Sequence, residues 1–155
     1  MSYASDELLR FVVESNAIEG ITRKPTNAEL EAHRCFLAVG KVTPDTLQAL
    51  VSVCAPGAML RTQRNMNVRV GDHYPPPGGP EIALRLEALL EHANTPNYDP
   101  HWVHIAYETL HPFMDGNGRS GRALWAWMML RQHGWGIKLG FLRAFYYQTL
   151  SASRR

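Results

Sequence analysis

The 155-residue sequence contains only two cysteines, Cys35 and Cys54. Two cysteines supply neither a disulfide framework nor a zinc knuckle, so we expect a reducing compartment and two small buried apolar side chains. No apolar run approaches the roughly 18–20 residues that span a bilayer, the longest being Ala123–Leu130. The first residues, Met-Ser-Tyr-Ala-Ser-Asp-Glu, lack the order of a signal peptide. These absences predict a cytoplasmic protein.

An excess of one charge is also absent. Lys plus Arg number 16 and Asp plus Glu number 14, which leaves a net charge of +2. We therefore expect neither nucleic-acid nor membrane partners. Only Lys24, Lys41 and Lys138 are lysines. Arginine suits bidentate contacts with phosphate or carboxylate, although a compositional bias of the genome would give the same excess.

What the sequence does contain is residues that typically start and end helices. The pair Thr26 and Glu29 has the spacing of a capping box, and Thr43 and Asp99 each precede a proline that can open a helix. Apolar residues recur at helical spacing in seven segments. The first predicted helix includes Leu8–Val12. The next three run from Thr26 to before Gly40, from Pro44 towards Cys54, and from Pro80 through Leu90. The last three run from Pro100 to about Leu110, through Leu124–Leu130 to before Gly134, and from about Lys138 through Leu150.

Residues 66–79 interrupt this helical pattern. Met66–Val70 alternates apolar and polar residues, as a half-exposed strand does. Gly71 and Asp72 follow, and the run Pro75–Pro80 would blunt one edge of any pairing. We expect a short exposed hairpin or extended flap on an otherwise all-α domain.

The chemistry is concentrated in the segment His-Pro-Phe-Met-Asp-Gly-Asn-Gly-Arg-Ser-Gly-Arg, residues 111–122, between two predicted helices. Gly116 and Gly118 let the backbone turn tightly and approach a ligand. The N-terminus of the following helix favours an anion. Arg119 and Arg122 lie three residues apart, so they project from nearly the same helix face.

Two further side chains of this segment suit a reaction. Asp115 offers the hard oxygen ligand that Mg²⁺ needs, and His111 can accept a proton near neutral pH. A base, a metal ligand, an anion-binding loop and two arginines predict a phosphoryl- or nucleotidyl-transfer site. His101 and His104 have the spacing of a metal pair but lack a third ligand, so we expect surface and core positions for them.

Residues 111–122 resemble the Fic family motif, His-x-Phe-x-Asp/Glu-Gly-Asn-Gly-Arg-x-x-Arg, and match every fixed position. The resemblance covers about residues 10–150, because the segment Val68–Gly71 and the helices flanking the motif fall where the family has them. It implies a mostly α fold, a compact bundle of about seven helices with a short β-hairpin flap beside the active site.

The resemblance also implies an activity, transfer of AMP from ATP to a Ser, Thr or Tyr hydroxyl of a target protein. His111 would deprotonate the hydroxyl, Asp115 would hold Mg²⁺ or Mn²⁺, and Phe113 would anchor the loop in the core. The family's phosphate-binding positions correspond to Gly116, Asn117, Gly118, Arg119 and Arg122. Arg122 would hold the γ-phosphate.

In the family the flap aligns the target by strand-like backbone pairing, a role that would fall here to Val68, Arg69 and Val70. Ser15-Asn16-Ala17-Ile18-Glu19-Gly20 matches Ser/Thr-x-x-x-Glu-Gly/Asn, the inhibitory motif of Fic proteins that inhibit themselves. By resemblance, Ser15 and Glu19 would engage Arg122 and Glu19 would occupy the γ-phosphate position. The alternative from the residues alone is that Ser15 and Glu19 form an ordinary i, i+4 pair and that Gly20 stops the helix.

We therefore predict one Fic domain over residues 1–155, with an inhibitory helix at 1–22, a flap at 66–79 and the catalytic segment at 111–122. The predicted function is an autoinhibited protein adenylyltransferase. One alternative is another reaction at the same site, either removal of AMP by water or transfer of another phosphate-containing group. A second alternative is a non-catalytic module that binds nucleotides or peptides. The target protein, self-modification and a homodimer stay open.

Overall fold

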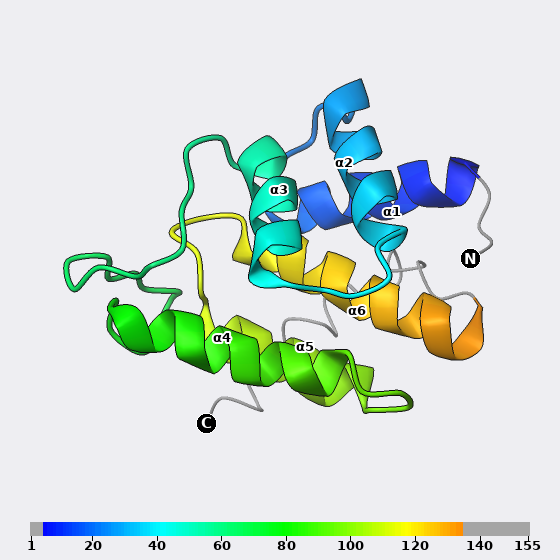
Figure 1. Ribbon diagram of the computed structural model, residues 1–155. Helices are drawn as coiled ribbons and strands as arrows, with labels where there is room; N and C mark the ends of the chain where they lie inside the picture. Colours follow the sequence, from blue (N-terminus) through cyan, green and yellow to red (C-terminus); the bar gives the residue numbers. More distant parts are fainter. Residues whose placement is uncertain (1–4, 135–155) are drawn as a thin grey trace.

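The computed structural model describes residues 5–134, which form six α-helices around one another (Figure 1). This part of the chain contains no β-strand, so the prediction of a mostly α fold is confirmed. The helix expected from about Lys138 lies outside the described residues. The helices are α1 (Ser5–Ile18), α2 (Asn27–Leu37), α3 (Pro44–Cys54), α4 (Pro80–Ala93), α5 (Pro100–Leu110) and α6 (Asn117–His133).

The helix starts follow the local signals in the sequence. Thr26 Oγ1 accepts the Glu29 N–H at 3.1 Å, and Glu29 Oε1 accepts the Thr26 N–H at 3.0 Å, which completes the predicted capping box. Thr43 forms the same reciprocal pair with Thr46, and Asp99 Oδ1 accepts the His101 N–H at 2.9 Å. Each contact satisfies a backbone donor that has no partner inside its own helix.

Helix α6 is the centre of the fold. It packs against α1, α2, α3 and α5, and Figure 1 shows it between α2 and α3 on one side and α4 and α5 on the other. The first two turns of α6 bury polar side chains, including Arg119 and Arg122, and the rest of the helix is buried by apolar ones. The apolar residues of α6 that are buried are Ala123, Leu124, Ala126, Trp127, Met128 and Leu130. The packing therefore fixes the N-terminus of α6, where the two motif arginines lie.

The predicted hairpin at 66–79 is reduced to a single antiparallel bridge between Val70 and His73. The two residues exchange N–H···O bonds of 2.9 Å, and Gly71 turns the chain with a φ of +58°. The three prolines at 75–77 have no N–H to donate, so the pairing ends there. The His73 ring also contacts the Thr109 carbonyl at 2.9 Å, which attaches the turn to α5.

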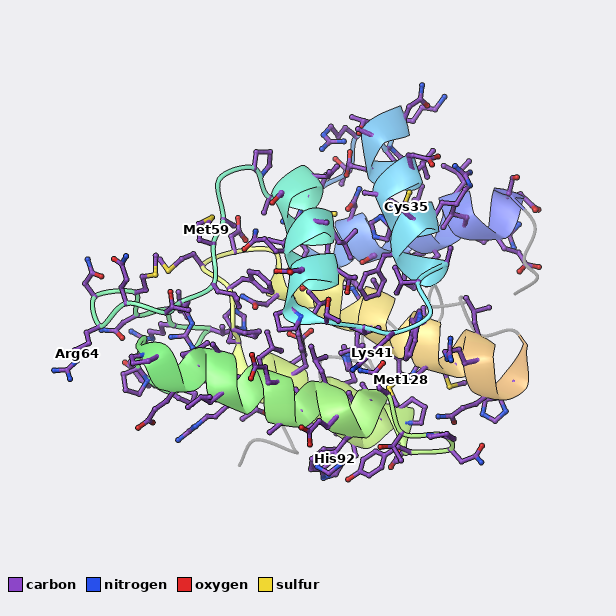
Figure 2. The ribbon with its side chains drawn as sticks, in the orientation of Figure 1. Cys35, Lys41, Met59, Arg64, His92 and Met128 are labelled. Carbon is purple, nitrogen blue, oxygen red and sulfur yellow. The ribbon has the colours of Figure 1, made fainter. Side chains whose placement is uncertain are left out.

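The expected burial of both cysteines is correct for one and wrong for the other. Cys54 is buried, and burial raises its pKa to about 11. Cys35 is exposed on α2 (Figure 2), where its thiol donates to Glu31 Oε1 at 3.5 Å and that hydrogen bond raises its pKa. His101 is exposed and His104 is buried, as predicted. None of the helices between residues 5 and 134 is long and apolar enough to cross a membrane.

Candidate functional site

The loop between α5 and α6 is held by backbone geometry and by one side chain. His111 ends α5 in the left-handed conformation, with φ +52° and ψ +63°. The Asn117 side chain accepts the Phe113 N–H and donates to the Phe113 carbonyl, both at 2.8 Å. Phe113 is fully buried, so it anchors the loop as predicted. Because the Asn117 amide is used in this way, its remaining contribution to an anion site is its backbone N–H.

The N-terminus of α6 is an anion-binding position. Gly116 precedes it with φ +81°, and a Cβ at this residue would lie 3.2 Å from that of Ala55. The structure places no side-chain cap on this helix among the described residues. The first N–H groups of α6 therefore remain for a ligand, together with the positive end of the helix dipole.

Asp115 and Arg119 flank this N-terminus. The Asp115 carboxylate is 74% exposed, and its Oδ1 accepts the Gly116 N–H at 2.7 Å. Arg119 is buried and donates to the Cys54 carbonyl, with its Nη2 at 3.9 Å from Asp115 Oδ1. The carbonyl fixes the guanidinium at the edge of the site.

An accessible carboxylate such as that of Asp115, beside an anion-binding helix end, fits Mg²⁺ or Mn²⁺. Magnesium usually takes one or two protein carboxylates and completes its octahedron with phosphate and water oxygens. Between residues 5 and 134, no cluster of three or more His, Cys, Asp or Glu side chains could hold a metal ion without such a ligand. Asp115 would therefore bind the ion together with a phosphate-bearing substrate.

These groups line one cleft of about 520 Å³, a volume within the ordinary range for small-molecule sites. The cleft joins segments that are far apart in the sequence. Its lining residues are Glu19, Ile21, Val68, Arg69, His111, Met114, Asp115, Gly116, Asn117, Gly118 and Arg119. Of the site residues predicted from the sequence, Ser15, Val70, Phe113 and Arg122 are not in this lining.

Arg122 lies behind the cleft and contacts the N-terminal motif. The guanidinium is only 2% exposed; its Nε donates to Ser15 Oγ at 2.9 Å, and its Nη2 donates to the Ser15 carbonyl at 2.8 Å. The same Nη2 donates to Glu19 Oε2 at 2.9 Å. The expected contact of both motif residues with Arg122 is therefore present.

The Glu19 carboxylate also lies directly over the anion-binding loop. A Cβ added at Gly118 would be 2.5 Å from Glu19 Oε2, so a larger residue here would displace the Glu19 carboxylate. The backbone of Gly118 does not have a positive φ, so the close contact comes from the neighbouring carboxylate and not from the turn. A negative group of the protein thus occupies space beside the N-terminus of α6.

A network that the sequence did not reveal holds the end of α1. Glu29 Oε2 accepts from the Asn16 side chain at 3.0 Å, and Glu29 Oε1 accepts from Arg23 at 2.6 Å. Burial would raise the pKa of Glu29, but the hydrogen bonds from Arg23, Thr26 and Asn16 together lower it to about 2. The sequence predicts Glu29 only as a capping residue. No local sequence pattern indicates its hydrogen bond to Asn16 in α1.

The comparison with known families agrees with this site. A family model described as the Fic/DOC family matches residues 37–129, which is more than half of the chain and includes the loop and residues 117–129 of α6. The protein belongs to the Fic/DOC family. Members of this family are typically transferases that use ATP and a divalent metal ion. The matched range begins after α1, so it does not include the Ser15–Gly20 motif.

Proposed function

We propose that this protein is an adenylyltransferase that transfers AMP from ATP to a hydroxyl group of a target protein. The observation that carries the proposal is the cleft that brings His111 and Asp115 to the uncapped N-terminus of α6. That helix end would bind the phosphates, and Arg119 would add positive charge at its edge. The two remaining groups would supply a base and a metal ligand.

The proposed reaction is a substitution at the α-phosphorus. His111 takes the proton of the attacking hydroxyl, whose oxygen bonds to the α-phosphorus while the bond to the pyrophosphate oxygen breaks. Pyrophosphate leaves, and the target carries AMP. A Mg²⁺ or Mn²⁺ ion on Asp115 would neutralise phosphate charge in this step. Arg119 and the N–H groups of Asn117 and Gly118 hold the phosphates in place.

We further propose that Glu19 inhibits this reaction. Its carboxylate lies over Gly118 and pairs with Arg122, so it competes with a terminal phosphate for the same guanidinium. Like charge on the carboxylate and the phosphate would also raise the cost of binding ATP in a reactive position. Transfer then requires Glu19 to move away.

Val68 and Arg69 lie on the cleft, so we propose that the target runs along residues 68–70 and places its hydroxyl near His111. Backbone pairing of this kind reads little of the target's sequence. A second copy of the chain could present such a segment in the same way. The proposal therefore includes self-modification, in which one copy modifies another.

A second candidate is removal of AMP from a modified protein. Glu19 is 33% exposed and lines the cleft with His111, so its carboxylate can also orient a water molecule. In that reaction water attacks the phosphorus, and the target hydroxyl leaves with a proton. Glu19 is then required for activity, whereas in the first reaction it opposes activity.

The experiment uses ATP labelled at the α-phosphate with Mg²⁺ and a cell lysate. Wild type and Glu19→Gly are compared with His111→Ala made in the Glu19→Gly background, and modified proteins are identified by mass spectrometry. Label on protein with Glu19→Gly but not with His111→Ala supports transfer. Loss of label from pre-modified protein that occurs with wild type, and with neither variant, supports removal of AMP. If the protein binds ATP but neither adds label to protein nor removes it, both proposals are overturned in favour of a binding module.

A further inference from the structure

Arg61 is a fully buried arginine that contacts four backbone carbonyls and no carboxylate of the described residues. Its Nε donates to the His111 carbonyl at 2.7 Å, and its Nη2 donates to the Leu110 carbonyl at 2.9 Å. Its Nη1 donates to the carbonyls of Met66 at 3.1 Å and Pro76 at 2.9 Å. One guanidinium thus joins the end of α5 to both sides of the flap.

The backbone of Arg61 strengthens the same connection. Its N–H donates to the Pro112 carbonyl at 2.9 Å, and its carbonyl accepts the Gly79 N–H at 2.9 Å. Side chain and backbone together therefore bind three consecutive carbonyls of the chain, those of residues 110, 111 and 112. The flap is tied to the same residue at 66, 76 and 79.

The contacts with residues 110 and 111 fix the conformation of His111. The Leu110 carbonyl belongs to the peptide group before His111, and the His111 carbonyl belongs to the peptide group after it. Holding both peptide groups sets φ and ψ of the residue between them. His111 has φ +52° and ψ +63°, a left-handed conformation that a residue with a side chain adopts only when its surroundings enforce it.

Within residues 5–134 the acceptors of the Arg61 side chain are all backbone carbonyls, so carbonyls compensate its charge. Burial lowers the pKa of Arg61, and a buried guanidinium is costly unless its N–H groups are satisfied. Two of its four acceptors are at the C-terminus of α5, the negative end of the helix dipole. Lysine offers three donors from a single point and cannot match four carbonyls in this planar arrangement.

We propose that Arg61 is a positioning residue that holds the backbone of His111 in its left-handed conformation and fixes the flap relative to it. The inference rests on the proposed function, because it assumes that His111 is the base and that residues 68–70 align the target. Arg61 contacts neither the N-terminus of α6 nor Asp115, so it acts on the base and the target and not on ATP.

The test compares Arg61→Lys and Arg61→Met in the Glu19→Gly background, with Arg64→Met as the matched control. Arg64 lies in the same loop but is exposed at its outer end (Figure 2). We expect the Arg61 variants to lower kcat by on the order of 10²-fold, the scale of a misplaced reacting group, with ATP affinity unchanged. Arg64→Met should behave like its parent. Unchanged kcat in Arg61→Lys would overturn the proposal, as would equal losses of kcat and ATP affinity.

A second measurement is independent of activity and of variants that fail to fold. In the wild type, exchange of the Arg61 Nε–H with solvent should be slow, and its NMR signal should show coupling to the His111 carbonyl carbon. Fast exchange without coupling would overturn the proposal. If Glu19→Gly itself transfers no AMP, the proposed function fails, whereas this measurement still decides whether Arg61 holds His111.

Discussion

Glu19 and Arg122 are 103 residues apart in the chain, and the carboxylate of one lies 2.9 Å from the guanidinium of the other. Arg122 is almost fully buried, whereas Glu19 keeps a third of its side chain exposed. The pair therefore combines a fixed cation with a carboxylate that can leave through solvent. This arrangement suits a contact that opens and closes without unfolding the domain.

The first prediction concerns this ion pair. Glu19→Gly should raise AMP transfer about tenfold to hundredfold, because a charged hydrogen bond contributes about 1.5–3 kcal/mol and each 1.4 kcal/mol is tenfold in rate. Glu19→Asp should give partial relief, since its shorter side chain reaches Arg122 poorly. Initial rates with labelled ATP measure both. Glu14→Gln, in helix α1 just before Glu19, serves as the control and should match wild type; equal rates for wild type and Glu19→Gly would rule out inhibition.

The sequence predicted those features whose cause is local. Helix starts at Thr26, Thr43 and Asp99 depend on residues within one turn, and all three caps are present. The segment 111–122 also forms the expected loop and helix start. This segment can be predicted from the sequence because its residue types and their spacing indicate the chemistry directly.

Other features depend on contacts between distant segments, which no local pattern reveals. Arg61 binds carbonyls 49 and 50 residues away, and any residue type can supply a carbonyl. The sequence also does not predict the hydrogen bond between Glu29 and Asn16, because a capping box already accounts for a glutamate at that position. Cys35 was expected inside because its residue type is often buried, but it falls on the outer face of α2.

The second prediction concerns Glu29 and pH. Its pKa is about 2 in the folded protein against an ordinary 4.5, so the unfolded chain binds more protons between these values. The stabilisation is fully present above pH 4.5 and is lost as the pH falls towards 2. It amounts to on the order of 3 kcal/mol. Urea unfolding at several pH values should show a shallower acid loss for Glu29→Gln than for wild type.

Glu31→Gln is the control for that series. Glu31 lies on the same helix, but its ion pair with Arg34 is exposed on both sides, so its removal should have little effect. If Glu29→Gln and wild type lost stability in parallel below pH 4.5, the network around Glu29 would not be the source of the acid sensitivity.

The third prediction concerns His111. His111→Ala should lower AMP transfer by about 10²–10⁴-fold, the usual contribution of a general base. ATP binding should persist, because the N-terminus of α6 and Arg119 are unchanged. Calorimetry with ATP and single-turnover transfer assays separate the two effects. Full transfer by the purified variant would assign the base to another group.

The fourth prediction concerns the metal ion. A chelator should abolish transfer, and Mg²⁺ or Mn²⁺ should restore it, because Asp115 is the exposed carboxylate beside the phosphate position. Asp115→Asn keeps the size of the side chain but weakens metal binding, so it should need much more Mg²⁺ for half-maximal transfer. A metal titration of initial rates gives this value. An unchanged Mg²⁺ requirement would place the ion elsewhere.

The last prediction concerns the flap, and it separates backbone pairing from side-chain recognition. Arg69 lines the cleft, and its Nε donates to the Gly71 carbonyl at 2.6 Å. Arg69→Pro removes the backbone N–H and constrains the segment, whereas Arg69→Ala removes the side chain but keeps the N–H. If the target pairs with the backbone, the proline variant should lose most target modification while the alanine variant retains it. Because Arg69 lines the same cleft as the N-terminus of α6, ATP affinity is measured for each variant so that weaker ATP binding is separated from weaker target docking. Target modification and ATP binding are measured side by side in the Glu19→Gly background. Equal losses in the two variants would show that the arginine side chain recognises the target, and full activity of Arg69→Pro would show that the target docks outside residues 68–70.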